Sequence, residues 1–293
     1  MRNLKFIINK EYDKKQLKSF LKNEVGISSR LVKKLKQSDV GLLRNGDHIR
    51  TVDLVYCGDK IDINIDEGDN DIEATFGELD IVYEDDDMLV INKSPLVAMH
   101  PTHNHQGDTL ANDVAGYLQK KGKVCTFRSI GRLDKGTSGL TLIALNSYCA
   151  SSLSKNKISK TYYAIADGVY NSSGTIDRPI YRPDPMKTLR AVGENGEKAI
   201  THWKAIAGDE KRTLLEINLE TGRTHQIRVH FSFLSTPLTG DRLYGKERKD
   251  ITHQALHCGK MEFIHPVTKE KISLSAPLPK EMEKFVKKMQ VKI

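Results

Sequence analysis

The sequence lacks any apolar run close to the roughly 20 residues that a membrane-spanning helix needs. Its first ten residues, MRNLKFIINK, lack the apolar core of a signal peptide. The four cysteines, Cys57, Cys125, Cys149 and Cys258, form no CxxC pair, which argues against a zinc ribbon or a redox dithiol and is typical of a reducing compartment. We therefore expect a soluble, cytoplasmic protein that does not associate with a membrane.

Internal repeats, low-complexity tracts and coiled-coil heptads are also missing, so nothing in the sequence predicts an oligomer or an obligate protein partner, and we expect a monomer. The 293 residues are enough for one large domain and one small one.

Net charge differs between three parts of the chain. Residues 1–65 have a net charge of +6, residues 66–88 have −11, and the remainder has +13. Two basic bodies joined by an acidic strip favour a polyanionic partner such as RNA.

The first 66 residues predict two short helices and a hairpin. Leu17, Phe20, Leu21 and Val25 have helical spacing before Gly26, and a second helix begins at a serine cap, with Leu31 and Leu35 facing inward. An Asn-Gly pair at 45–46 predicts a tight turn, and GDKIDINI predicts a strand with alternating isoleucines.

This order of elements, with the landmarks GIS, SRLVKKLK, RNG and GDKIDI, resembles the S4 RNA-binding module. The resemblance implies an S4-like RNA-binding domain at 1–66, with Arg30, Lys33 and Lys34 contacting RNA. A small helical cap with a solvated basic face is the alternative. Residues 67–77 are acidic and poor in apolar side chains, as expected of a linker, and a second domain would span 78–293.

The second domain is predicted to be α+β, with a mixed, mostly antiparallel sheet. Short apolar or alternating runs predict strands at DMLVINK, GLTLIALN, KTYYAIADG, TLLEINLETG and KISLSAPL. GDTLANDVAGYLQKKG and PKEMEKFVKKM predict helices, the first opened by Asp108.

Two features suggest ligand sites that closer inspection does not favour. The glycine-rich stretch SIGRLDKGTSGLTLIA has the glycine spacing of a phosphate loop but lacks its lysine, which weakens the case for a nucleotide-dependent enzyme. Histidines cluster at 100–105 (HPTHNH), at 253–257 (HQALH) and in GRTHQIRVH. The cluster at 100–105 has no thiolate or carboxylate to complete a ligand set. The HQALH cluster has Gln254 where a zinc-protease helix has its general base, and the arginines of GRTHQIRVH would repel a metal cation. We expect no metal.

GRTHQIRVH is better explained as the start of a helix that faces an anion. Thr224 is predicted to cap a helix that ends before Pro237, with Arg223 just before its N-terminus and Arg228 one turn in. Its inward stripe would be Ile227, Phe231 and Leu234. A carboxylate near these arginines would stay ionised and suit a nucleophile or base, although a purely structural ion pair is the alternative.

Six motifs together resemble the RluA family of pseudouridine synthases, including its RluC/RluD-like members. They are VINKSPLVAMHP, GRLDKGTSGL, KTYYAIADG, LETGRTHQIRVH, GDRLYG and HQALHCGKMEFIHP, and they extend the resemblance from Glu78 to about Val286. The resemblance implies that Asp134 is the catalytic aspartate, that Arg223 pairs with it, that Tyr162 stacks on the target base and that Arg132 helps to extrude the uridine. Lys160, His225 and Arg228 would also contact RNA, although a solvated charge is equally consistent with Lys160. Gly131 departs from the family, which often has histidine there.

The resemblance implies an isomerase that converts specific uridines to pseudouridine without a cofactor, because the reaction is redox-neutral and the uracil never leaves the enzyme. A base in a stack must be flipped out to be reached, and an aromatic face would hold it. We expect the substrate to be large-subunit (23S-type) ribosomal RNA or its precursor. Two alternatives stay open: a synthase acting on transfer RNA, and a non-catalytic RNA-binding or ribosome-assembly factor.

Overall fold

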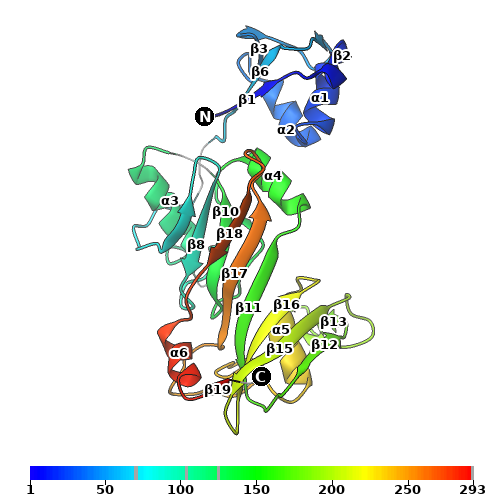
Figure 1. Ribbon diagram of the computed structural model, residues 1–293. Helices are drawn as coiled ribbons and strands as arrows, with labels where there is room; N and C mark the ends of the chain where they lie inside the picture. Colours follow the sequence, from blue (N-terminus) through cyan, green and yellow to red (C-terminus); the bar gives the residue numbers. More distant parts are fainter. Residues whose placement is uncertain (69–71, 103–104, 124–125, 292–293) are drawn as a thin grey trace.

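The computed structural model describes residues 1–68, 72–102, 105–123 and 126–291, so His103 and Cys125 lie outside the described residues. Figure 1 shows a small N-terminal module at one end of a larger body built around a long sheet. No helix in the described part of the chain is both long and apolar enough to cross a membrane.

The N-terminal module (residues 1–65) has its own sheet, with strand order β1-β6-β3-β4, and its own apolar core. Its elements are β1 (Arg2–Ile7), η1 (Lys10–Tyr12), β2 (Lys15–Gln16), α1 (Leu17–Asn23), α2 (Ser29–Leu35), β3 (Leu42–Arg44), β4 (Asp47–His48), β5 (Leu54–Val55) and β6 (Lys60–Ile65). The Ser28 hydroxyl caps α2 by accepting from Leu31 N at 3.3 Å, and Asn45 and Gly46 both have positive φ in the hairpin turn. The predicted helices, hairpin and strand of this region are confirmed.

The larger body is built on an eleven-stranded sheet whose main path is β12-β15-β16-β11-β17-β10-β8-β7. All its neighbouring strands run antiparallel except β10 and β17, which confirms the α+β, mostly antiparallel prediction. The strands of the body are β7 (Ile81–Glu84), β8 (Met88–Lys93), β9 (Arg128–Ile130), β10 (Ser138–Ala144), β11 (Ser159–Ala166), β12 (Ser173–Asp177), β13 (Ile180–Tyr181), β14 (Ala191–Val192), β15 (Ile200–Gly208), β16 (Thr213–Leu219), β17 (Leu256–Ile264), β18 (Lys271–Ser275) and β19 (Gln290–Val291). Strands β13 and β14 form a separate hairpin.

Among the described residues, four helices accompany this sheet: α3 (Leu110–Lys120), α4 (Ser147–Lys155), α5 (Gln226–Phe233) and α6 (Lys280–Val286). The first begins one residue later than expected, because Thr109 rather than Asp108 stands at its N-cap and forms a capping box with Asn112. The prediction for α5 is wrong in detail: His225 is its N-cap in place of Thr224, and Leu234 lies beyond its end and is exposed. The HQALH segment is no helix, since His253 lies in a loop and His257 on β17.

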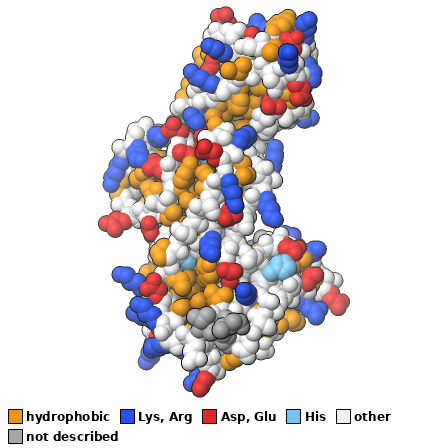
Figure 2. Space-filling view, viewed as in Figure 1, with side chains coloured by type: hydrophobic (Ala, Val, Ile, Leu, Met, Phe, Trp, Pro, Cys, Tyr) orange, Lys and Arg blue, Asp and Glu red, His pale blue; other side chains and the backbone are white. Residues whose placement is uncertain are grey.

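The N-terminal module contacts the body through a buried tyrosine and an ion pair. Tyr148 of α4 is 2% exposed and belongs to the apolar core of the module, where its hydroxyl donates to the Val25 or the Pro266 carbonyl. Arg2 of β1 donates two hydrogen bonds to the Asp87 carboxylate of the body, at 2.9 and 2.8 Å. Figure 2 shows Lys and Arg side chains spread over the surface of both parts, interspersed with Asp and Glu.

Candidate active site

The loop between β9 and β10 presents Asp134 at the end of a central strand. Gly136 N donates to the Pro95 carbonyl at 2.8 Å, and Thr137 N donates to the Asp134 carbonyl at 3.0 Å. The amide of Gln254 donates to the Lys135 carbonyl and to the Thr137 hydroxyl, both at 3.0 Å. The turn needs glycine at 136, where φ is +89° and a Cβ would lie 2.3 Å from the Gln254 side-chain oxygen.

Arg228 of α5 holds the Asp134 carboxylate and is itself held by Asp241. Its Nη1 lies 3.3 Å from Asp134 Oδ2, while its Nε and Nη2 donate to Asp241 at 2.7 and 2.9 Å. The arginine side chain is 7% exposed and Asp241 is fully buried. Although burial opposes it, the hydrogen bonds to Asp241 raise the pKa of Arg228, so the guanidinium stays charged. One cation thus lies between two carboxylates.

Arg223 does not pair with Asp134 in the structure, and this part of the sequence prediction is corrected. Its Nε donates to the Lys198 carbonyl at 3.0 Å and its Nη1 lies 3.4 Å from Glu197. The cause is the turn before α5, which the Gln226 side chain closes by accepting from Arg223 N at 2.9 Å. The helix therefore begins later than expected, and the second arginine of the motif, not the first, points at the carboxylate.

His225 lies beside the same oxygen of Asp134 as Arg228 and has an unusual backbone conformation. Its φ is +59°, which is uncommon for a residue other than glycine, and its Nε2 lies 3.8 Å from Asp134 Oδ2. Burial lowers the pKa of His225, although the neighbouring Asp134 opposes the shift. The Tyr244 hydroxyl accepts from Arg190 N at 2.9 Å and lies 2.8 Å from His225 Nδ1, which fixes the orientation of the imidazole ring beside the carboxylate.

Tyr162 lies on β11 beside the same pocket and is 9% exposed. The pocket has a volume of about 60 Å³, and its lining includes Asp134, Tyr162, His225, Arg228 and Leu256. Burial raises the pKa of Tyr162, so the phenol stays protonated. The structure therefore gathers an aspartate, a buried arginine, a neutral histidine and an aromatic side chain around one hollow.

Arg132, Lys160 and Gly131 border the entrance of this pocket. A groove of about 470 Å³ beside it is lined by all three residues together with Tyr162. Arg132 is exposed, and Lys160 is half-buried, with a pKa that burial lowers. A Cβ at Gly131 would lie 3.1 Å from Lys160 Nζ, so the lysine occupies the space in front of the glycine.

Three further residues of the site carry no role in the sequence prediction. Asp241 and Tyr244 belong to the quoted motif GDRLYG, in which the aspartate lies three residues before the tyrosine. Lys93 of β8 is 2% exposed and donates to the Ser94 and Val97 carbonyls at 2.7 and 2.9 Å. Burial lowers its pKa to about 7, and the charge of Asp134 opposes this shift. No sequence pattern distinguishes this lysine from an exposed one.

The remaining predicted residues, Arg30, Lys33 and Lys34, lie on α2 of the N-terminal module, apart from the pocket (Figure 1). All three are exposed, and Lys34 donates to the Asp66 carbonyl.

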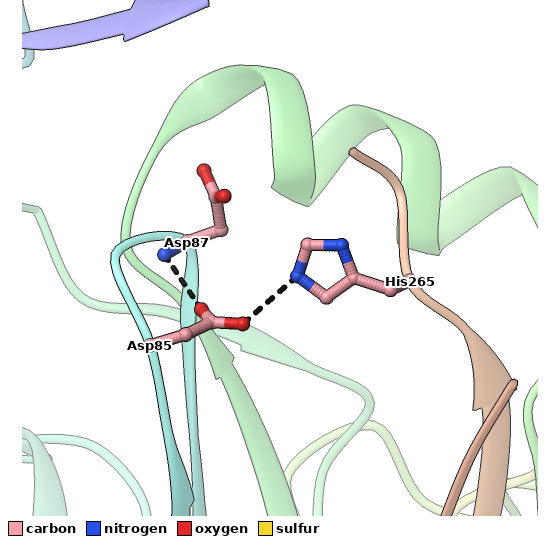
Figure 3. A group of neighbouring side chains, drawn as sticks. All are labelled: Asp85, Asp87 and His265. Carbon is pink, nitrogen blue, oxygen red and sulfur yellow. Dashed lines mark hydrogen bonds and ion pairs between the residues drawn. The ribbon is translucent and has the colours of Figure 1, made fainter. Parts of the chain in front are cut away.

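Among the described residues, one group of side chains, Asp85, Asp87 and His265, brings three potential metal ligands together (Figure 3). It lies where the N-terminal module meets the body, away from the pocket. Asp85 accepts from His265 Nε2 at 2.9 Å and from Asp87 N at 2.7 Å, and Asp87 accepts from Arg2 and Asn146. These bonds explain the group as a structural network.

Comparison with known proteins identifies the family of the chain. Residues 87–233 match the family described as RNA pseudouridylate synthase. The chain is 38% identical over 290 residues to the uncharacterized RNA pseudouridine synthase YhcT of Bacillus subtilis, covering 96% of each chain. It is 34% identical to ribosomal large subunit pseudouridine synthase D of Haemophilus influenzae, covering 82% of this chain and 81% of the relative. The solved structure of human RNA pseudouridylate synthase domain containing 1 aligns with a TM-score of 0.56 and 27% identity, over 68% of this chain and 83% of that one.

Proposed function

Because the chain belongs to the family of RNA pseudouridylate synthases, which are isomerases, we propose that it converts uridine to pseudouridine in RNA at the pocket around Asp134. The observation that supports this site most strongly is the arrangement of Asp134 against Arg228 and His225, with Tyr162 lining the same pocket. Arg228 replaces Arg223 as the proposed partner of the catalytic aspartate.

The proposed reaction breaks the C1′–N1 glycosidic bond and forms a C1′–C5 bond, while C5 loses a proton and N1 gains one. The composition of the RNA does not change, so the reaction requires no net electron transfer. Asp134 acts on the flipped uridine through its carboxylate, which lies 3.3 Å from the buried guanidinium of Arg228. Tyr162 supplies the aromatic face against which the base stacks, a contact worth roughly 1–3 kcal/mol.

We propose that large-subunit ribosomal RNA or its precursor is the substrate. The supporting observation is the similarity to relatives named ribosomal large subunit pseudouridine synthase D, in Haemophilus influenzae and in Pasteurella multocida. Residues 1–66 would form an S4-like RNA-binding domain, 67–77 the linker and 78–293 the catalytic domain. The exposed Arg30, Lys33 and Lys34 would bind phosphates at a distance from the pocket.

The test is a map of pseudouridines in all cellular RNA from cells with the gene, without it, and without it but supplied with either the wild-type gene or the Asp134→Asn variant. We expect one or more sites in large-subunit ribosomal RNA to disappear on deletion, to return with the wild type and to stay absent with the variant. Loss of sites in transfer RNA instead would identify the other substrate. An unchanged map would favour a non-catalytic RNA-binding factor.

A further inference from the structure

Arg223 lies where three hollows of the surface meet. It lines the pocket at Asp134, the groove of about 470 Å³ that contains Lys160, and a second groove of about 370 Å³ beside the β13–β14 hairpin. The two grooves are much larger than the central pocket, as needed if the pocket receives one base and the grooves receive the chain on either side of it. Arg223 therefore places a cation at the junction of the pocket and the two grooves.

The guanidinium of Arg223 is held in place by one hydrogen bond to a carbonyl and still has N–H donors that could bind a ligand. Its Nε donates to the Lys198 carbonyl at 3.0 Å, and its main-chain N–H donates to the Gln226 side chain at 2.9 Å. Four of its five N–H donors are not used by the carbonyl, and the side chain is 36% exposed. Such a planar fork suits the oxygens of a phosphate.

The anion that now faces Arg223 is Glu197, and its main chain is fixed. Glu197 N donates to the Ile180 carbonyl at 2.8 Å, and Ile180 N donates to the Glu197 carbonyl at 2.9 Å. A Cβ at Gly196 would lie 2.6 Å from the Ile180 backbone, so the turn that leads to Glu197 requires glycine. The carboxylate itself is 73% exposed and lies 3.4 Å from Nη1. An ion pair so open to water is weak and readily exchanged.

We propose that Arg223 is a phosphate clamp for the RNA backbone next to the flipped uridine, and that Glu197 is an exchangeable counter-ion which the phosphate displaces on binding. This inference rests on the proposed function, since it takes RNA as the ligand of the pocket. The side chains of Arg132 and Lys160 make no hydrogen bond or ion pair with the residues that the structure describes, and they extend the same basic surface into the adjoining groove. The positioning of the substrate, not the chemistry at Asp134, would depend on Arg223.

The experiment measures how a fluorescein-labelled, uridine-rich 12-nucleotide RNA binds to the full chain between 50 and 200 mM salt. Arg223→Gln should weaken binding about tenfold and reduce the slope of log affinity against log salt by about 0.7, the value for one lost phosphate contact on a single strand. Glu197→Gln should tighten binding about threefold, in line with loss of a weak competing ion pair, and should have no effect when Arg223→Gln is already present.

The matched control is Glu262→Gln, which makes the same charge change in an exposed pair with Lys271 (2.9 Å) that lines none of the three hollows. It should leave affinity unchanged. Equal tightening by Glu262→Gln and Glu197→Gln, or an unchanged salt slope in Arg223→Gln, would overturn the clamp and leave Arg223–Glu197 as a structural pair.

A second readout separates this inference from the proposed function. With a large-subunit ribosomal RNA transcript as substrate, Arg223→Gln should raise KM and largely retain kcat. A fall in kcat at unchanged KM would overturn the clamp. If the wild type forms no pseudouridine on any RNA, the proposed function fails, whereas if it does and the binding predictions are wrong, only the clamp fails.

Discussion

Replacing Arg228 by methionine should damage stability and activity together, because one guanidinium neutralises two carboxylates. Asp241 is fully buried, and without the arginine it would keep only the main-chain N–H bonds of Leu243 and Tyr244, at 3.0 and 3.1 Å. Removing one partner of a buried ion pair costs about 3–5 kcal/mol. For a chain of this size each kcal/mol lowers Tm by about 2–4 °C, so the expected drop is roughly 6–20 °C.

The two carboxylates should behave differently when they are changed one at a time. Asp134 is 18% exposed and has one contact with Arg228, at 3.3 Å, whereas Asp241 has two shorter ones. Asp134→Asn should therefore change the free energy of unfolding by no more than about 1 kcal/mol. The stabilising partner of Arg228 is Asp241, and its proposed functional partner is Asp134.

Thermal and urea unfolding of the wild type, Arg228→Met and Asp134→Asn measure these differences, with Arg50→Met as the control. Arg50 pairs with Asp53 at 3.0 Å but is 73% exposed, so its loss should be nearly silent. If Arg228→Met lowered Tm no more than Arg50→Met does, the contacts of Arg228 with Asp241 and Asp134 would not stabilise the fold. Circular dichroism at 25 °C would show whether the variant is folded before its activity is compared.

Two further predictions concern Lys93 and Gly136. Burial lowers the pKa of folded Lys93 from 10.5 to about 7, so between these pH values the unfolded chain binds a proton that the folded chain lacks. The free energy of unfolding of the wild type should therefore rise with pH by up to about 1.4 kcal/mol per unit, and Lys93→Met should not show this rise. Equal changes in the urea midpoint of the wild type and Lys93→Met between pH 7 and pH 9 would refute the prediction. Gly136→Ala should abolish most product formation and destabilise the chain more than Gly58→Ala does, because both have φ near +90° but only the first would collide with Gln254; similar unfolding free energies would contradict this.

Local pattern was sufficient to predict much of the fold. Alternating isoleucines identified β6, and apolar runs identified β8, β10, β11, β16 and β18, because burial of one or both faces imposes these patterns directly. The Asn-Gly pair identified the β3–β4 hairpin. Helix α4 was not predicted, because its sequence SYCASSLSK is rich in serine and has no clear apolar stripe. Its buried Tyr148 packs into the core of the N-terminal module and not only against the sheet.

The site was harder to predict because its geometry depends on turns. The motif GRTHQIR contains two arginines, and spacing alone could not show which one faces Asp134. The answer depends on Gln226 closing the turn and on the left-handed conformation of His225, both of which delay the start of α5. The histidines of HQALH have the spacing of a zinc-protease helix, but β17 begins at Leu256. Lys93 joins the site only through tertiary contacts that no local pattern encodes.

The measurement that tests the central claim most directly is conversion of uridine by the purified chain on a large-subunit ribosomal RNA transcript, followed by mass spectrometry of the digested RNA. Asp134→Asn should form no pseudouridine while binding the transcript within about twofold of the wild type, because one weak contact is lost. Asp250→Asn, the same change in an exposed pair with Arg248, should convert uridine at the wild-type rate. Wild-type conversion by folded Asp134→Asn would contradict the assignment of Asp134 as the catalytic residue.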